Sequence, residues 1–360
     1  MNEYSEYKMS LLKPLFIAST FLSMSVFTAQ AEVKVVTSIK PVHSLVSAVM
    51  EGVGSPTLLV EGASSPHNFT LKPSQAVTLE NADLVFWIGH ELEAFLEKPL
   101  EVIASKAKSI ELIDAHNITK LELREGGAFD GHAHDEHGHE EDHDKEDEHA
   151  HKDDEDHDKE EEHNHEEKDH NEHEHDNHEE HKEHADGAFD PHVWLDPINA
   201  KALVHEIEEA LVKSDPENAA KYEANAKSTM AKLDDLVVEV SSKLALVKGK
   251  NFIVFHDAYH NFEERFGLSA VGSVTVSPEV LPGAKRIREL QTKVKELKAT
   301  CVFSEPQFDA KLVTTVTEGT SAKTGVLDPL GTSIKDGPEL YFKLIHNMAD
   351  SFQTCLSDES

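Results

Sequence analysis

The sequence predicts an α/β protein in which two lobes of parallel-sheet βα units are joined by one long rigid helix. A disordered insertion rich in histidine and acidic residues is expected in the first lobe. Three observations support this fold class. Short apolar runs alternate with helical patterns near both ends of the chain, which is typical of βαβ units. A long helical pattern separates these two regions, and one internal segment is almost devoid of apolar residues.

The first region of alternation predicts an N-terminal lobe over 32–212. Its apolar runs predict strands at 33–37, 56–60, 84–89 and 109–113. Helical patterns lie between them, at 42–50, 72–81 and 91–106. Because a helix is the usual connection between parallel neighbours, the sheet should be mainly parallel.

A low-complexity insertion interrupts this lobe at 131–186. Its residues 132–184 hold 16 His, 26 Asp or Glu and 5 Lys. Such a segment buries too little apolar surface to offset the entropy lost on ordering, so we expect a disordered loop. Imidazole and carboxylate groups are ligands for divalent metals, zinc first among them. The insertion therefore indicates which ion matters, but it does not show where that ion is held tightly.

The middle of the chain is expected to be helical. A first helix is predicted at 198–213. Asp215-Pro216-Glu217 is a strong start signal for a second helix, because proline is favoured in the first turn. We expect this linking helix over 213–248. Roughly thirty residues at about 1.5 Å each span about 45 Å, enough to connect two halves of the protein.

A C-terminal lobe is expected over 249–360. Strands are predicted at 251–255, 268–276, 301–304 and 325–327. Helices are predicted at 258–266, 282–299, 310–321 and 338–356. No sequence repeat relates the two lobes.

The charge of the chain is strongly negative. Residues 132–184 contribute −21 of the formal net charge of −35, which leaves −14 for the rest. An acidic protein does not suit nucleic acid, since neutralising phosphates requires clusters of Lys and Arg. We therefore expect no nucleic-acid partner.

The N-terminus has the pattern of a secretory signal peptide over 1–31. Lys8 and Lys13 precede a short apolar stretch, and Ala29-Gln30-Ala31 is a small-x-small cleavage site. A retained membrane anchor is the alternative, but the apolar stretch is short for a spanning helix. The mature protein should begin near Glu32, outside the cytoplasm.

Two cysteines are present, Cys301 and Cys355. In an exported protein an even number favours a disulfide, with two buried thiols as the alternative. Two cysteines without a nearby histidine do not have the spacing of a structural zinc site.

Nine histidines lie outside the insertion, and three of them occupy distinctive positions. His256 directly follows a predicted strand, where ligands gather in α/β folds. His67 follows a strand of the first lobe, and His192 lies where the insertion rejoins folded sequence. Asp328 also follows a strand and could point into the same crevice. Three neutral imidazoles with a carboxylate or water make a tetrahedral zinc site, here between the lobes.

Several motifs resemble the zinc-specific receptors of bacterial ABC importers, the ZnuA type, over essentially the whole mature chain. They are Ser65-Pro66-His67-Asn68-Phe69-Thr70-Leu71-Lys72-Pro73-Ser74, His192-Val193-Trp194-Leu195, Val254-Phe255-His256-Asp257-Ala258-Tyr259, Glu305-Pro306-Gln307-Phe308 and Leu327-Asp328-Pro329-Leu330-Gly331. The resemblance implies a periplasmic receptor that carries Zn²⁺ between two lobes. It also implies delivery to a membrane permease driven by a cytoplasmic ATPase.

Carried over by position, the family's three zinc ligands are His67, His192 and His256. Relatives that prefer manganese have a carboxylate in place of His256, so this histidine favours zinc. Some zinc members carry a glutamate directly before the first histidine, but Pro66 stands there in this chain. The fourth ligand is then Asp328 or water.

Three further residues are candidates for supporting roles. Glu305 follows a predicted strand and could orient a ligand histidine. His90 and His260 could approach the crevice, or be surface residues.

No phosphate-binding loop or nucleophile elbow is present, and we expect a monomeric receptor, not an enzyme. The alternative is a periplasmic zinc buffer in which the insertion is the main site.

Overall fold

The structure, a computed structural model, describes residues 32–124, 129, 189–275 and 282–357. The expected signal peptide and the expected insertion at 131–186 both lie outside the described residues. The described residues from 33 onward belong to one compact unit. Among the described residues, no helix is both long enough and apolar enough to cross a membrane.

The N-terminal lobe is built on a parallel four-stranded sheet with the order β2-β1-β3-β4. Its strands are β1 (Val35–Thr37), β2 (Thr57–Leu58), β3 (Leu84–Trp87) and β4 (Lys108–Glu111). Its helices are α1 (Lys40–Val49), α2 (Pro73–Glu80), α3 (His90–Glu93) and α4 (Glu97–Val102), with 3-10 turns η1 (Ala94–Leu96) and η2 (Leu112–Asp114). β1 and β3 are buried at every position, as continuous apolar runs in a covered parallel sheet should be.

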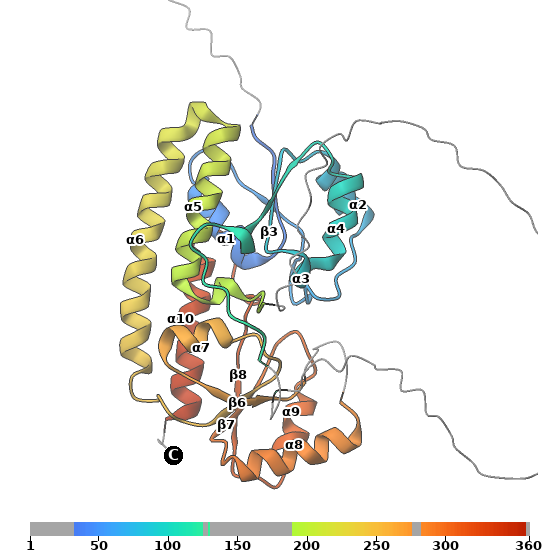
Figure 1. The fold of residues 1–360 in the computed structure, drawn as a ribbon, viewed down its shortest axis with the longest axis vertical. Coiled ribbons are helices and arrows are strands. Elements are labelled where there is room, and N and C mark those ends of the chain that lie inside the picture. Colours follow the sequence, from blue (N-terminus) through green and yellow to red (C-terminus); the bar gives the residue numbers. More distant parts are fainter. Residues whose placement is uncertain (1–31, 125–128, 130–188, 276–281, 358–360) are drawn as a thin grey trace, which may run out of the picture. The chain divides into compact units, whose positions relative to one another are not determined.

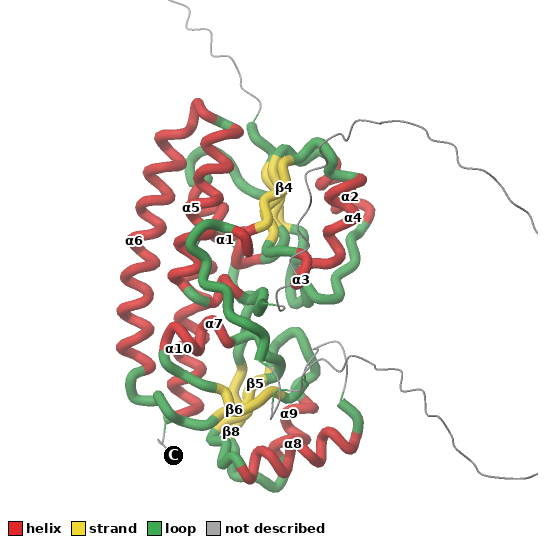
Figure 2. The backbone as a smooth tube through the Cα atoms, in the orientation of Figure 1, coloured by secondary structure: helices red, strands yellow, loops and turns green. Residues whose placement is uncertain are grey.

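The C-terminal lobe repeats this topology, with a parallel sheet of order β6-β5-β7-β8. The strands are β5 (Phe252–Val254), β6 (Ala270–Ser273), β7 (Cys301–Ser304) and β8 (Lys323–Val326). The helices are α7 (His260–Phe266), α8 (Ala284–Glu296), α9 (Lys311–Thr317) and α10 (Leu340–Leu356). Figure 2 shows the two sheets one above the other. The two lobes thus share one sheet topology although their sequences show no repeat.

Two long helices lie side by side, and the longer one runs along one side of both lobes (Figure 1). α5 (Pro197–Ser214) packs against α6 (Ala219–Leu244), and the turn between them contains η4 (Pro216–Asn218). α6 has 26 residues and so is about 39 Å long. It contacts α1 of the first lobe and both α7 and α10 of the second. This confirms the expected long helix joining the lobes.

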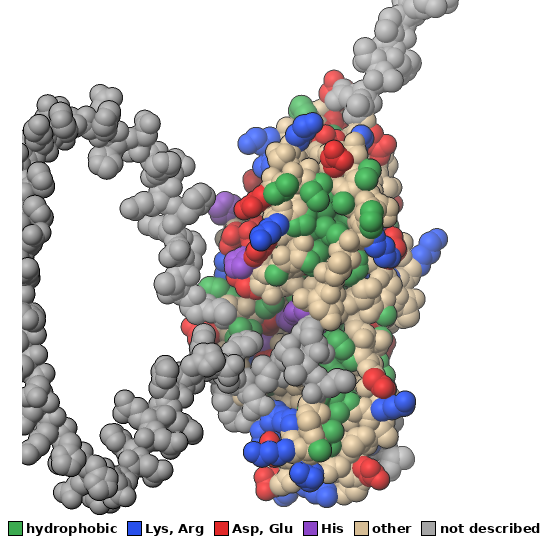
Figure 3. Space-filling model, turned by 90° about the vertical axis from the view of Figure 1, so that its right-hand side faces the viewer, with side chains coloured by type: hydrophobic (Ala, Val, Ile, Leu, Met, Phe, Trp, Pro, Cys, Tyr) green, Lys and Arg blue, Asp and Glu red, His purple; other side chains and the backbone are tan. Residues whose placement is uncertain are grey.

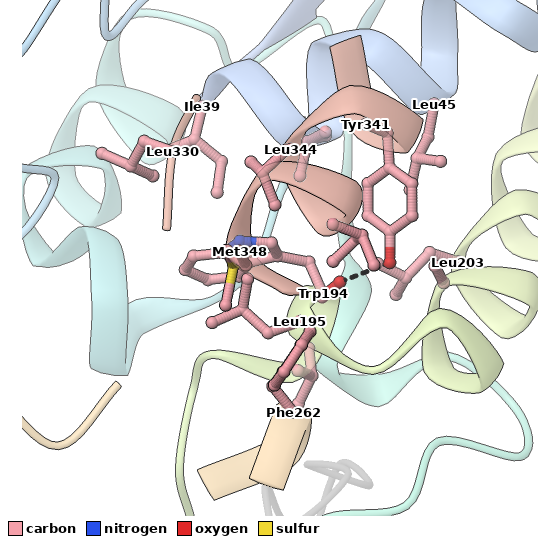
Figure 4. Close-up of a cluster of buried hydrophobic side chains, with 14 of the residues drawn as sticks. Ile39, Leu45, Trp194, Leu195, Leu203, Phe262, Leu330, Tyr341, Leu344 and Met348 are labelled. Carbon is pink, nitrogen blue, oxygen red and sulfur yellow. Dashed lines mark hydrogen bonds between the residues drawn. The ribbon is translucent and has the colours of Figure 1, made fainter. Parts of the chain in front are cut away.

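One hydrophobic core extends through both lobes. Figure 4 shows Ile39 and Leu45 from the first lobe beside Leu344 and Met348 of α10, all of them fully or almost fully buried. Trp194, from the 3-10 turn η3 (Val193–Leu195), lies in the middle of this cluster. Its indole Nε1 donates to the carbonyl of Pro329 at 2.9 Å, and its own carbonyl accepts from the Tyr341 hydroxyl at 2.6 Å.

A polar seam accompanies this shared core. Lys40, at the start of α1, is 5% exposed. Its Nζ donates to the carbonyls of Thr332 and Ile334 at 3.3 and 2.9 Å and lies 3.0 Å from a carboxylate oxygen of Asp336. A nearly buried ammonium group needs such partners, so α1 is bound to the loop that follows β8.

The expected helix at 91–106 is the clearest departure from the sequence prediction. It is divided into α3, η1 and α4. Pro99 explains the break, because its ring excludes the carbonyl four residues earlier and its nitrogen cannot donate. The linking helix begins at Ala219 instead of 213, because residues 213 and 214 end α5 and a turn with η4 follows. The other helices and strands lie within four residues of their predicted bounds.

Cys301 in β7 and Cys355 in α10 form the expected disulfide, with their Cα atoms 6.1 Å apart. Both side chains are buried. The bond therefore ties the central region of the second sheet to the helix that packs across both lobes.

Removing this disulfide should lower the free energy of unfolding. The bond spans a sequence separation of 54, for which the chain-entropy model gives a stabilisation of about 4 kcal/mol. Urea titration of the Cys301→Ala/Cys355→Ala variant measures the loss. Equal midpoints for the variant and the oxidised parent would contradict this assignment of stability to the disulfide.

Candidate metal site

Three imidazoles from separate parts of the chain meet in one place. The ring centroids of His67, His192 and His256 lie 5.4, 5.7 and 5.3 Å apart, taken pairwise. One ring nitrogen from each lies within 4.8 Å of the other two. The three candidates predicted from sequence are thus brought together.

Each imidazole is positioned by a different local structure. His256 follows β5 at the carboxyl end of its sheet, as expected for a ligand-binding residue of an α/β fold. His192 precedes η3 and is followed by the buried Trp194. His67 lies in the loop between β2 and α2, where its backbone N–H donates to the Ser65 hydroxyl at 3.3 Å. His192 and His256 are each 5% exposed, while His67 is partly exposed.

Two buried carboxylates orient two of the imidazoles. Nδ1 of His192 lies 2.7 Å from Asp190 Oδ1, and Nδ1 of His256 lies 2.7 Å from Glu305 Oε1. Asp190 and Glu305 are 1% and 2% exposed. An ionised carboxylate only accepts, so Nδ1 donates and Nε2 carries the lone pair in both rings. This is the arrangement that prepares a histidine to bind a metal through Nε2.

Glu305 has the contact that its sequence position suggested, whereas Asp190 escaped the sequence analysis. It stands two residues before His192 in Asp190-Pro191-His192, but that spacing alone does not fix the contact, which depends on how the two side chains turn. The second oxygen of Asp190 accepts from the Asn261 amide at 2.8 Å. Both oxygens are therefore engaged, and the carboxylate cannot rotate freely.

The electrostatic environment favours neutral imidazole at His67. Burial, followed by the proximity of His192 and His256, lowers the pKa of His67 to about 2. A proton therefore does not compete for this ring near neutral pH.

The imidazoles line a small cavity with walls from both lobes. The remaining lining residues are mostly apolar or aromatic and comprise Ser65, Pro66, Trp194, Glu305, Gln307, Phe308, Pro329 and Leu330. Figure 3 shows a histidine side chain reaching the surface at the level where the lobes meet. Three ring nitrogens that point into a mostly apolar cavity suit a small ligand that needs a fixed set of donor atoms.

Asp328 lies outside the imidazole cluster of the described residues. Its two oxygens accept hydrogen bonds from the backbone N–H groups of Leu330, Gly331 and Thr332 and from the Thr332 hydroxyl. The amide of Gln307 also donates to it at 3.2 Å. The carboxylate is thus occupied in holding the turn that follows β8.

The other two candidates are also separate from the imidazole cluster. His90 forms a second, mostly exposed group with Glu91 and Glu111, and its two ring nitrogens lie 3.1 and 3.3 Å from their carboxylate oxygens. His260 begins α7 and is not one of the three clustered imidazoles.

Two α/β lobes that share a core and converge three imidazoles on one interlobe cavity define a solute-binding protein whose ligand is a metal ion. A family model described as ZnuA, zinc-uptake complex component A, periplasmic, matches residues 35–355. The chain belongs to this family.

Individual relatives agree with this assignment. The high-affinity zinc uptake system protein ZnuA of Brucella suis is 54% identical over 351 residues, covering 97% of this chain and 100% of that protein. A crystal structure of ZnuA superposes with a TM-score of 0.68 at 23% identity and covers 91% of this chain and 100% of its own.

A structure solved with a different bound metal has the same fold. The solute-binding protein FpvC from Pseudomonas aeruginosa, in complex with Mn²⁺, has a TM-score of 0.67 at 17% identity, covering 91% of this chain and 99% of its own.

Removing the orienting carboxylates should weaken metal binding. We expect Asp190→Asn and Glu305→Gln each to reduce zinc affinity by about 10- to 100-fold, the usual effect of losing a carboxylate behind a ligand histidine. Competition with a strong chelator measures the change. Asp234→Asn alters an exposed carboxylate paired with Lys201 and is the matched control. Equal affinities for all three variants would rule out the orienting role.

The lowered pKa of His67 should also affect the stability of the metal-free protein. Between its unfolded value of about 6.5 and its folded value, the unfolded chain holds a proton that the folded chain lacks. Stability should then fall as the pH drops below about 6.5, by at most about 1.4 kcal/mol per pH unit from this residue. Urea titrations from pH 6.5 to 4.5 should give a shallower dependence for His67→Gln. Parallel curves would refute the assignment.

Proposed function

We propose that this protein is an extracytoplasmic receptor that captures Zn²⁺ between its two lobes. It then delivers the ion to the membrane permease of an ABC importer, which a cytoplasmic ATPase drives. The observation that carries the proposal is the convergence of His67, His192 and His256 on one interlobe cavity. Family membership and the names of the zinc-uptake relatives support it.

The donor set favours zinc over harder cations. Imidazole nitrogen suits zinc, whereas manganese and magnesium prefer oxygen ligands. Zinc binds histidine at about 2.0–2.1 Å, which places the nitrogens of a tetrahedral site about 3.4 Å apart. Three nitrogens that already lie within 4.8 Å of one another need only a small inward movement. With Asp328 engaged in its own turn, water is the better candidate for the fourth ligand.

The proposal describes a carrier in which no bond is made or broken. A zinc hydrolase would also need a general base close to an open coordination position. The two carboxylates that could serve are Asp257 and Glu305. Asp257 is held by Arg124, and Glu305 is hydrogen-bonded to His256. Both carboxylates are thus engaged by protein groups, which favours transport over hydrolysis.

The proposal extends to the organisation and location of the chain. Residues 1–31 act as a cleaved signal peptide, and the mature monomer is periplasmic. Residues 32–212 form the N-terminal lobe, 213–248 the linking helix and 249–360 the C-terminal lobe. α6 lies within the range of the linking helix and β5 begins the C-terminal lobe, which supports this division, although α5 ends two residues beyond 212.

A comparison of two variants tests the function. The first lacks residues 132–184, and the second keeps them but carries His67→Ala, His192→Ala and His256→Ala. We expect the shortened protein to bind one zinc tightly, because the three imidazoles remain. The triple variant should bind zinc only weakly. A competitive titration of each with zinc and a strong chelator measures both.

The same titration addresses the runner-up, a periplasmic zinc buffer with the histidine-rich insertion as its main site. If tight binding disappears with residues 132–184 and persists in the triple variant, the buffer is the correct function. The receptor proposal would then be abandoned.

A further inference from the structure

The two described segments that flank the insertion are tied to each other. We call residues 119–124, 129, 189 and 190 the insertion base. Glu122 and Phe189 form an antiparallel bridge, and the N–H of Asp190 donates to the carbonyl of Leu121 at 2.8 Å. In Figure 1 the green segment that follows η2 runs from the upper lobe down to the lower one. The base therefore starts in one lobe and ends on the other.

Arg124 makes the strongest contact of the insertion base with the C-terminal lobe. Its Nε donates to both oxygens of Asp257 at 3.1 and 3.0 Å, and its Nη2 also contacts Asp257. Its Nη1 and Nη2 donate to Glu263 at 2.7 and 3.1 Å. The guanidinium carbon lies 4.2 Å from the centre of the Phe129 ring. The planar guanidinium of Arg124 thus binds two carboxylates and stacks on one aromatic ring.

This ion cluster is mostly shielded from water. The side chains of Arg124, Asp257 and Glu263 are 16%, 18% and 2% exposed. Burial disfavours the charge of Arg124, but the two carboxylates outweigh it and raise the pKa of the guanidinium. Buried ion clusters contribute little net stability relative to apolar packing, and some are kept because they impose one geometry.

Asp257 follows the metal-site histidine directly. The chain between β5 and α7 is held at two consecutive residues, since Glu305 binds the His256 ring and Arg124 binds the Asp257 carboxylate. The N–H of Ala258 donates to the carbonyl of His256 at 2.9 Å, which closes a tight turn there. A ligand ring must be held within about 0.5 Å and 10–20° to bind a metal well. Fixing Asp257 therefore fixes the backbone that aims His256.

The other side of the insertion base reaches a second metal-site histidine through the same helix. Asn261 of α7 donates to Asp190, and Asp190 contacts His192. Glu263, also of α7, accepts from Arg124 and from the N–H of Ala270 at 2.7 Å. α7 thus contacts both described flanks of the insertion, through Arg124, which binds Asp257, and through Asp190, which contacts His192.

We propose that the insertion base is part of the metal-capturing machinery, with Arg124 as a positioning residue that acts on His256 through Asp257. This inference rests on the proposed zinc-binding function. It separates the base, which supports the tight site, from residues 132–184, which are not needed for it.

Substitution of Arg124 in the full-length mature protein tests the proposal. Arg124→Gln should weaken zinc binding by about 10-fold or more, the lower end of the range for outer-shell changes. Arg124→Lys keeps the charge without the fork and should lose less. Asp257→Asn should match Arg124→Gln, and the double variant should be no weaker than either, because both act on one pathway. The visible absorption of bound Co²⁺ should change in Arg124→Gln, since the geometry at the metal changes.

Arg265 on the same helix provides a matched control. It makes a two-pronged contact with Asp196, with both distances 2.7 Å, and neither residue belongs to the imidazole cluster. Arg265→Gln should lower thermal stability but leave zinc affinity within twofold of the parent and the Co²⁺ spectrum unchanged. The proposal is overturned if Arg124→Gln also stays within twofold, or if both arginine variants lose affinity equally. A parent protein that binds no zinc tightly would instead overturn the proposed function.

Discussion

Trp194 is buried at the point where the two lobes meet, and the rest of the site is arranged around it. Its ring packs 5.3 Å from the ring of His192, and its polar groups bond to Pro329 and Tyr341 in the C-terminal part of the chain. Because one apolar core continues through both lobes at this residue, the cavity walls cannot separate without exposing that core. The shared core thus sets the distance between His192, on one side, and His256, on the other.

The turn after β8 converts a suspected ligand into a structural part of the interface. Asp328 accepts hydrogen bonds from the backbone N–H groups of residues 330–332. Carbonyl groups of the same turn point toward Trp194 and Lys40. Pro329 accepts from Trp194, while Thr332 and Ile334 accept from Lys40. A carboxylate that follows a strand can therefore stabilise the interface between the lobes without binding the ligand. The backbone N–H groups that donate to Asp328 suit this structural role better than metal binding.

In the imidazole cluster, as at the interface, polar groups are fixed by hydrogen bonds to buried partners. Asp190 and Glu305 fix the rings of His192 and His256, and each carboxylate is nearly inaccessible to water. Apolar surroundings keep His67 neutral, so the site is ready for a cation without having to lose a proton from that ring.

Local patterns in the sequence determined the α/β class, the two regions of alternation, the long helix and three histidines at strand or loop ends. These features depend on periodicity and on residue type, which are readable without knowing contacts. The tertiary structure alone decided that Asp190 lies behind His192, that Arg124 bridges to Asp257 and Glu263, and that Asp328 holds a turn. These contacts join residues far apart in the chain, or depend on which way a side chain turns, and no local spacing encodes them. The break of the helix at 91–106 lies between these cases, since Pro99 was visible in the sequence but its effect on the preceding turn had to be seen in the fold.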